Sequence, residues 1–295
     1  MPAEGRYPKS QAEFDELFST ELSCVEYYRQ LRWPEGLRCL KCGGTQGWTA
    51  SRFRWVCADC KREQSVTTGT LLHGTRLPLK TWFRVIWQVC EQKNGISALG
   101  LQRAVGFGSY HTALGWLRRL RAVMVFPGRR RLTGEVQVDE TFIGGVKRGV
   151  RGRGAAGKVL VLVAVEVRGT QIGRARLQII SGTTATTLLD TVKELIEPGS
   201  NVVTDGFASY VGLPGRGYKH TVSQPNLSQI EEPSLPKALR VAALLKQWLL
   251  GTHQGGVTHQ HLQSYLDEFV FRFNRRTSHN RGLLFRRLLQ QTLAS

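Results

Sequence analysis

The sequence predicts an α/β protein, because three segments of its 295 residues have different residue patterns. Residues 37–65 hold two cysteine pairs and little apolar mass. Residues 77–125 repeat apolar side chains at helical spacing, and the chain beyond the basic run at 129–131 alternates strand-like and helix-like segments. The predicted organisation is a helical lead-in over 1–36, a cysteine-rich segment over 37–65, a helical region over 66–127 and a mixed-sheet domain over 128–290.

Composition narrows the classes of partner. Apolar residues make up 41% of the chain, enough for a sizeable core, and 41 basic against 22 acidic residues give a net charge of +19. Such an excess repels itself, so a polyanionic partner is expected, with nucleic acid ahead of an anionic membrane surface or the ribosome. No apolar stretch approaches the ~20 residues that span a bilayer, and the N-terminus lacks a signal-peptide core. We therefore expect a cytoplasmic protein with no membrane partner.

The first half of the chain carries helix-start signals. Ser10 can cap a helix with Phe14 and Phe18 on one side. Within 77–125, a first helix is expected around residues 82–90, a second from Ser97 to about Gly106 and a third from Ser109. The short Gly-Phe-Gly break between them fits a helix-turn-helix, and a plain helical hairpin fits it equally well.

The cysteines form two CxxC pairs, Cys39/Cys42 and Cys57/Cys60, separated by fourteen residues. Each pair can present two thiolates to one tetrahedral zinc ion, and a closed four-sulfur site is structural because it leaves no position for water. Metal binding also explains how a segment with so little core can fold. The sequence therefore predicts a zinc ribbon, whereas Cys24 stands in apolar surroundings and is expected in the core, as is Cys90.

The predicted ribbon is basic and aromatic. Its surface suits contact with a nucleic-acid backbone through cations that are expected to bind DNA: Arg52, Arg54, Lys61 and Arg62. Trp48, Phe53 and Trp55 either join this surface or pack on the metal site, and the sequence leaves both readings open. A second set of DNA-binding cations is expected in the Gly-rich loop near 148–158: Lys147, Arg148, Arg151 and Arg153.

Strand and helix signals alternate after residue 131. Strands are expected over 136–143, 159–167, 174–180 and 201–204, and helices over 185–196, 238–250 and 259–274. Asp139 and Glu140 lie on the first strand, where alternation sends them to opposite faces. Asp205 follows the fourth strand and alone would be interpreted as a solvated turn residue.

Asp139 and Asp205, considered together in a strongly basic protein, are interpreted as metal ligands. Carboxylates of this kind hold the two divalent ions, ~4 Å apart, that phosphodiester chemistry requires. Hard oxygen ligands favour Mg²⁺, with Mn²⁺ as a substitute. Asp139 and Asp205 are thus candidate catalytic and magnesium-binding residues, and such a site needs a third ligand from a later element.

The chain resembles bacterial insertion-sequence transposases that carry a zinc ribbon before a DDE-type catalytic domain. The resemblance covers nearly the whole chain and depends on the order and spacing of short motifs. They are the Cys39–Cys60 ribbon, Thr68–Thr70, Ser97–Arg103, Val138–Gly145, Thr204–Tyr210 and His261–Arg276. It implies a ribonuclease-H-like catalytic domain in which Asp139 and Asp205 are the first two metal-binding acids.

The resemblance also implies a Glu, His or Asn ligand about seven residues before a lysine on a late helix. Lys246 matches the lysine and is a candidate catalytic residue, but Leu239 stands where the ligand should be. Glu231 or Glu232 in the preceding loop could substitute. The expected activity is binding of the terminal inverted repeats, metal-dependent cleavage and joining to a target, by a homo-oligomer on double-stranded DNA. The alternative is a DNA-binding remnant without a complete metal triad. A zinc-ribbon transcription factor would leave both aspartates unexplained.

Overall fold

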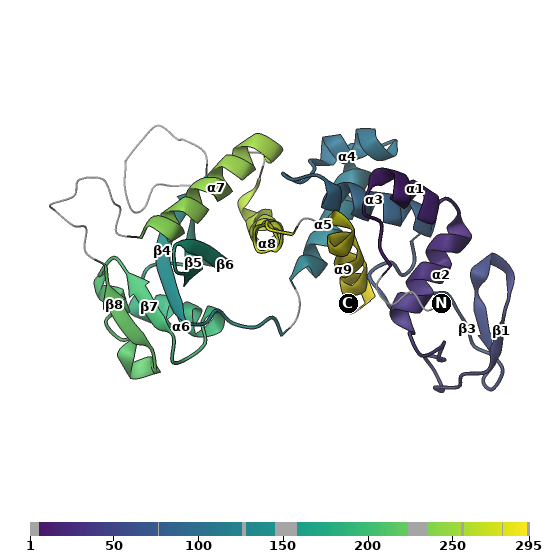
Figure 1. The fold of residues 1–295 in the computed structure, drawn as a ribbon, viewed down its shortest axis with the longest axis horizontal. Helices are drawn as coiled ribbons and strands as arrows, with labels where there is room; N and C mark the ends of the chain where they lie inside the picture. Colours follow the sequence, from purple (N-terminus) through teal and green to yellow (C-terminus); the bar gives the residue numbers. More distant parts are fainter. Residues whose placement is uncertain are drawn as a thin grey trace. The chain divides into compact units, whose positions relative to one another are not determined.

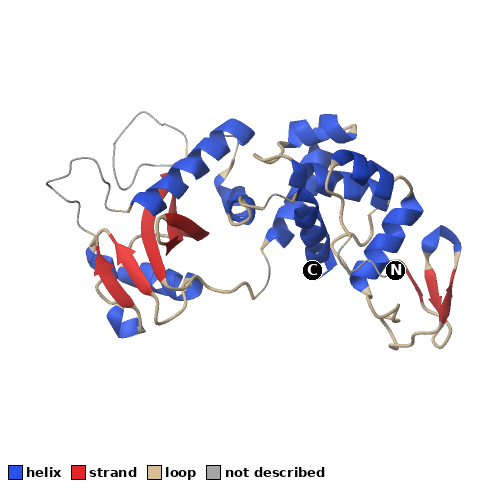
Figure 2. Cartoon of the chain, viewed as in Figure 1, coloured by secondary structure: helices blue, strands red, loops and turns tan. Residues whose placement is uncertain are grey.

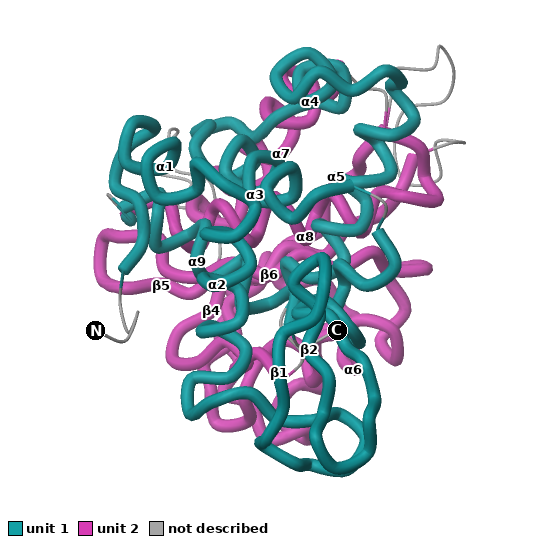
Figure 3. Tube along the Cα trace, turned by 90° about the vertical axis from the view of Figure 1, so that its right-hand side faces the viewer, with its two compact units in different colours: residues 1–126, 278–295 teal, residues 127–277 magenta. Residues whose placement is uncertain are grey.

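The computed structural model describes residues 6–75, 77–125, 128–144, 158–223, 235–254, 257–278 and 280–293. The chain divides into two compact units, coloured separately in Figure 3. The first unit contains residues 1–126 and 278–295, and the second contains residues 127–277. Within the described residues no helix is long and apolar enough to cross a membrane.

The first unit is helical, with a small three-stranded sheet. Its elements are α1 (Gln11–Leu17), α2 (Glu21–Arg32), β1 (Gly47–Thr49), η1 (Ser51–Phe53), β2 (Trp55–Cys57), β3 (Glu63–Gln64), α3 (Leu79–Glu91), α4 (Ala98–Val105), α5 (Tyr110–Met124) and α9 (Arg281–Leu293). The three serines predicted to begin helices are N-caps. Ser10, Ser97 and Ser109 each accept a hydrogen bond from a backbone amide in the first turn of their helix. Gly106 ends α4 in the left-handed conformation, at φ 80°.

The last helix groups with the N-terminal elements. Phe285 of α9 is fully buried and contacts the rings of Phe14, Phe18 and Phe83. The Tyr28 hydroxyl also lies 2.8 Å from the Thr292 hydroxyl. The predicted mixed-sheet domain extended to residue 290, and the sequence predicted no helix here. The structure differs because α9 buries its apolar side against aromatic residues more than 200 positions earlier in the chain.

The second unit is built on a five-stranded mixed sheet, shown in Figures 1 and 2. Its elements are β4 (Glu135–Ile143), β5 (Val159–Arg168), β6 (Gln171–Ile180), α6 (Ala185–Leu195), β7 (Asn201–Thr204), η2 (Ala208–Tyr210), η3 (Pro214–Arg216), β8 (Lys219–Val222), α7 (Pro236–His253), η4 (His259–His261) and α8 (Leu262–Phe273). The strand order is β6-β5-β4-β7-β8, antiparallel on the β6 side of β4 and parallel on the β8 side. This mixed sheet is consistent with the ribonuclease-H-like domain expected from the sequence.

Helices cover both faces of this sheet. Alternate strand residues, such as Val161 and Val203, join a core cluster with α7 and α8. Their neighbours, such as Leu162 and Val202, join a second cluster with α6. The doubly covered strand expected from the apolar run at 159–167 is β5. Each residue of the sheet can therefore be assigned to the α7/α8 face or the α6 face.

Candidate functional site

The four cysteines of the two CxxC pairs converge on one point. Their sulfur atoms all lie within 4.8 Å of one another, and two pairs, Cys39 with Cys60 and Cys42 with Cys57, are 3.5 Å apart. Zn–S bonds of ≈ 2.3 Å in a tetrahedron require sulfur atoms roughly 3.8 Å apart. The cluster therefore has the dimensions of a structural zinc site.

Two similar tight turns create this geometry. The amide of Gly43 donates to the carbonyl of Cys39 (2.9 Å), and the amide of Lys61 donates to the carbonyl of Cys57 (3.0 Å). Both closing residues have positive φ, 76° at Gly43 and 56° at Lys61. Gly47 completes the frame, since a Cβ there would lie 2.4 Å from the Trp55 ring. Trp55 can thus pack on Cys39 and Cys57, the only other buried members of this small core.

The sulfur atoms resist joint ionisation in the absence of a cation. Backbone amides of Cys42 and Lys41 lower the pKa of the Cys39 thiol to about 6. The amide of Gly44 also favours the Cys42 thiolate, but the sulfurs of Cys57, Cys60 and Cys39 outweigh it and raise the pKa of Cys42 to about 12. A second negative charge is therefore costly until a divalent cation arrives, and this donor set fits zinc.

The sequence left open whether the ribbon's aromatic side chains pack on the metal site or join the exposed surface, and the structure shows both. Trp55 packs on the cysteines, whereas Trp48 is 51% exposed and Phe53 is 41% exposed. The ammonium of Lys61 stands 5.4 Å from the centre of the Trp48 ring. All four predicted DNA-binding cations of the ribbon are exposed: Arg52, Arg54, Lys61 and Arg62. Arg54 also forms a 3.3 Å ion pair with Glu63.

Asp139 lies on β4, and Asp205 directly follows β7, the adjacent parallel strand. Strand β4 pairs with β7 in a register that places Gln137 opposite Val203. Extending this register by two residues places Asp139 opposite Asp205, just after β7 ends. Both aspartates share the α7/α8 face, because strand residues two positions apart point to the same side.

The pKa of Asp139 depends on the charges of two other candidate residues, Asp205 and Lys246. Burial raises the pKa of Asp139, and the negative charge of Asp205 raises it further. The Glu140 amide, which donates to Asp139 Oδ1 at 2.8 Å, and the positive charge of Lys246 act in the opposite direction. A half-buried carboxylate beside a second carboxylate is a site that a divalent cation would relieve.

Helix α7 is fastened directly to the strand that carries Asp139. The Gln137 Oε1 atom accepts hydrogen bonds from the amides of Lys237 (2.9 Å) and Ala238 (3.2 Å), at the start of the helix. Leu239 follows immediately and is 41% exposed, so it does not pack into the core. Lys246, two turns later, is also exposed. The helix therefore presents Leu239 and Lys246 on one stripe, seven residues apart.

Glu140 lies on the opposite face of the sheet from Asp139, as alternation predicted. Its carboxylate accepts a hydrogen bond from the hydroxyl of Tyr210, a buried residue of the α6 cluster. Asp205 accepts a hydrogen bond from the Phe207 amide at 3.0 Å, which fixes the turn after β7. Sequence reasoning missed the roles of Gln137 and Tyr210 because their partners are 70 or more residues away.

Some predicted site residues lie outside the part of the chain that the structure describes. They are the loop cations Lys147, Arg148, Arg151 and Arg153 and the possible substitute ligands Glu231 and Glu232. Among the described residues, the only group of three or more His, Cys, Asp or Glu placed to hold a metal is the cysteine cluster. No third ligand of these types joins Asp139 and Asp205 within the described residues.

Comparison with known protein families matches both parts of this arrangement. Residues 19–63 match the model of a transposase zinc-ribbon domain, and residues 131–274 match that of an ISXO2-like transposase domain. The two matches together cover more than half of the chain. The chain belongs to the insertion-sequence transposases with an N-terminal zinc ribbon. The first match contains the cysteine cluster, and the second contains Asp139, Asp205 and Lys246.

A curated relative points to the same class of mobile element. It is described as an uncharacterized protein in transposable element ISH50, from Halobacterium salinarum (strain ATCC 700922 / JCM 11081 / NRC-1). The two sequences are 27% identical over 140 residues, which is 46% of this chain and 45% of the relative. The chain thus matches less than half of that protein's length.

Proposed function

We propose that this transposase binds the terminal inverted repeats of its element and catalyses metal-dependent cleavage and strand transfer. The observation that carries the proposal is the register of β4 and β7, which sets Asp139 and Asp205 side by side within the matched transposase domain. Asp139 and Asp205 would hold Mg²⁺ or Mn²⁺, which supplies Lewis-acid activation of water or a 3′-hydroxyl when bound. Lys246 would hold a DNA phosphate beside them.

The DNA would be double-stranded and would meet the exposed cations of the ribbon, with zinc keeping that surface folded. The turn between α4 and α5 fits a helix-turn-helix that would also contact DNA. Both ends of an element must be held together for strand transfer, so we propose that the protein acts as a homo-oligomer on DNA.

One observation favours a second candidate, a DNA-binding remnant with weak or no cleavage. Leu239 is exposed on the stripe that leads to Lys246, at the position where the family resemblance requires a ligand. With only two carboxylates, a divalent ion would bind loosely and its geometry would be poorly fixed. The DNA-binding and zinc-binding functions do not depend on this position.

The deciding experiment compares three proteins on supercoiled DNA that carries the short inverted repeats flanking the gene, with Mg²⁺ or Mn²⁺ supplied. We expect weak nicking by the native protein, roughly tenfold or more from Leu239→His, and none from Asp139→Ala. Leu250→His, an exposed leucine on the same helix, is the matched control and should add nothing. Robust native cleavage without a gain from Leu239→His would show that another residue completes the site. Cleavage that survives Asp139→Ala would refute the assignment of the aspartates.

A further inference from the structure

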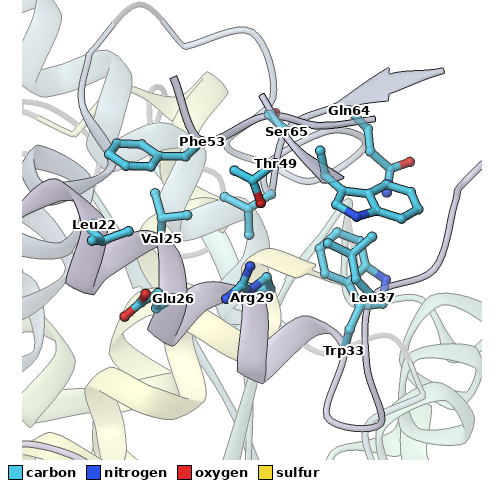
Figure 4. Close-up of a pocket in the computed structure, with 12 residues that line it drawn as sticks. Leu22, Val25, Glu26, Arg29, Trp33, Leu37, Thr49, Phe53, Gln64 and Ser65 are labelled. Carbon is cyan, nitrogen blue, oxygen red and sulfur yellow. The ribbon is translucent and has the colours of Figure 1, made fainter. Parts of the chain in front are cut away.

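A cavity of about 220 Å³ lies between α2 and the ribbon, inside the matched zinc-ribbon domain (Figure 4). Its apolar walls come from both elements. Leu22, Val25 and Trp33 line it from α2 and the residue after it, and Phe53 and Trp55 line it from the ribbon hairpin. Neither the cysteine cluster nor the aspartate pair uses this cavity.

Phe53 lines the cavity from the tip of the β1–β2 hairpin, where the backbone has an unusual conformation. Arg52 and Phe53 are consecutive non-glycine residues with positive φ, 54° and 57°. Two adjacent left-handed residues form the kind of tight hairpin turn that normally selects Asn-Gly. An Arg-Phe pair there is unfavourable for folding, and such strain is typical of sites where a side chain is held for a purpose. Here the strained turn keeps Phe53 at the cavity while leaving the side chain 41% exposed.

Polar residues also line the cavity: Glu26, Arg29, Thr49, Gln64 and Ser65. Figure 4 shows the Arg29 guanidinium and the Thr49 hydroxyl extending into the space between α2 and the ribbon. Arg29 is half-buried, and no described residue forms an ion pair with it. Glu26, one turn earlier on α2, also lines the cavity, is exposed and forms no ion pair with Arg29. The cavity thus combines aromatic walls with a half-buried guanidinium and an exposed carboxylate that are not paired with each other.

We propose that this cavity binds one unpaired nucleobase of DNA, stacked against its aromatic walls, with Arg29 on the flanking phosphate. Aromatic side chains and arginine together are the usual means of holding single-stranded nucleotides. The volume is below the 300–1,000 Å³ of ordinary small-molecule pockets, which suits a single base rather than a larger ligand. Charge favours DNA over an apolar peptide, since the chain carries +19 and the exposed Arg52 and Arg54 flank Phe53 in the sequence. This inference rests on the proposed DNA binding.

The test uses the full-length, zinc-loaded protein and two duplexes that differ only in a single-nucleotide bulge containing 2-aminopurine. We expect the bulged duplex to bind roughly 5- to 100-fold tighter than the paired one, and its fluorescence to fall as the base stacks. Arg29→Gln and Phe53→Gly should each remove most of this preference while leaving affinity for the paired duplex nearly unchanged. Glycine suits the positive φ of position 53, so that variant retains the turn. The controls Lys41→Gln and Leu40→Ala alter exposed ribbon residues outside the cavity and should retain the preference.

The outcomes separate this inference from the proposed function. A protein that binds neither duplex refutes the DNA-binding function itself. Equal affinity for both duplexes, or a preference that survives Arg29→Gln and Phe53→Gly, overturns the base pocket alone. If the two substitutions change the sedimentation mass and not the base preference, the cavity is occupied by a second copy of the chain and the assignment is wrong. Zinc content, measured for every variant, shows that the ribbon remains folded.

Discussion

The zinc ribbon and the β4–β8 sheet are stabilised by different means. The ribbon's own core contains three buried side chains, Cys39, Trp55 and Cys57, and two of them belong to the cysteine cluster that could hold a metal. The sheet has a large apolar cluster on each face, with α7 and α8 on one side and α6 on the other. Where apolar burial is scarce, the metal must supply the folding free energy, and where it is abundant, half-buried carboxylates can be tolerated for chemistry. Four predictions test this contrast.

The largest effect should follow loss of the metal. Cys57→Ser removes one of four ligands, and structural zinc contributes about 10–16 kcal/mol in small metal-dependent folds. We expect the variant to lose its zinc and residues 37–65 to exchange their amide hydrogens rapidly, while β4 and β5 keep native protection. Elemental analysis and hydrogen exchange provide the two measurements. Cys90→Ala, a buried cysteine outside the cluster, should retain one zinc per chain. Unfolding of both units together would show that the contrast is false.

The second prediction asks which region holds the DNA backbone. If six to ten phosphates are contacted, the affinity for duplex DNA should fall roughly 10³- to 10⁵-fold between 50 and 200 mM salt. The ribbon's four exposed cations should account for a slope of roughly 3–4 in a plot of log affinity against log salt. Replacing all four cations with glutamine should lower the slope by that amount. The four residues are Arg52, Arg54, Lys61 and Arg62. If these substitutions leave the slope unchanged, the DNA-binding surface lies in the second unit.

The third prediction compares an ion pair from each region. Glu166 of β5 is 2% exposed and accepts hydrogen bonds from the Arg174 Nε atom and the Thr133 amide, both at about 3.0 Å. Glu166→Ala leaves Arg174 without its buried partner and should cost about 3–5 kcal/mol of unfolding free energy. Glu63→Ala in the ribbon breaks an exposed pair with Arg54 and should cost under about 1 kcal/mol. Urea denaturation measures both, and equal costs would contradict the difference in burial.

The pH dependence of the Glu166 effect has a defined sign. Burial raises the pKa of Glu166, but hydrogen bonds from Arg174 and Thr133 and the charge of Arg174 outweigh it and lower the pKa overall. The folded state therefore favours the carboxylate, and this stabilisation is complete above the unfolded pKa of ≈ 4.3. It is lost as the pH falls through the lower folded value. The gap between the native protein and Glu166→Ala should accordingly narrow in acid.

Elements that depend on local residue patterns were predicted well from the sequence, and elements that depend on distant contacts were predicted poorly. Helix starts at Ser97 and Ser109 and strand β7 were predictable because caps and apolar runs act over a few residues. Strand β8 was missed because it is short and mostly exposed, with no alternation to detect. Helix α9 was missed although Leu284, Phe285, Leu288 and Leu289 repeat at helical spacing.

The candidate site shows the same limit. The strand positions of Asp139 and Asp205 were predictable because each follows or lies within an apolar run. The capping of α7 by Gln137 was not, because its partners are about 100 residues away. The exposure of Leu239 likewise depends on how that helix is fastened to the sheet.

The smallest predicted effect concerns the folding cost of the aspartate pair. Burial and the neighbouring Asp205 raise the pKa of Asp139, so the folded state disfavours its carboxylate. This destabilisation is absent at low pH, where Asp139 is protonated in both states, and appears as the pH rises through the unfolded value of ≈ 3.9 towards the higher folded one. Without added Mg²⁺, Asp139→Asn should therefore raise the unfolding free energy at pH 7 by roughly 0.5–2 kcal/mol, and the gain should shrink as the pH falls towards about 4.

Adding Mg²⁺ should reverse that order, because the native protein gains stability by binding the ion and the asparagine variant does not. Asp190→Asn is the matched control, since Asp190 forms an exposed 2.8 Å pair with Arg216 and should change stability by less than about 1 kcal/mol in either condition. Thermal denaturation over pH 4–8, with zinc retained in the ribbon, measures all three proteins. If Asp139→Asn is less stable than the native protein without Mg²⁺, the carboxylate contributes to the fold, and tolerance of a costly charge for chemistry is not the reason for its presence.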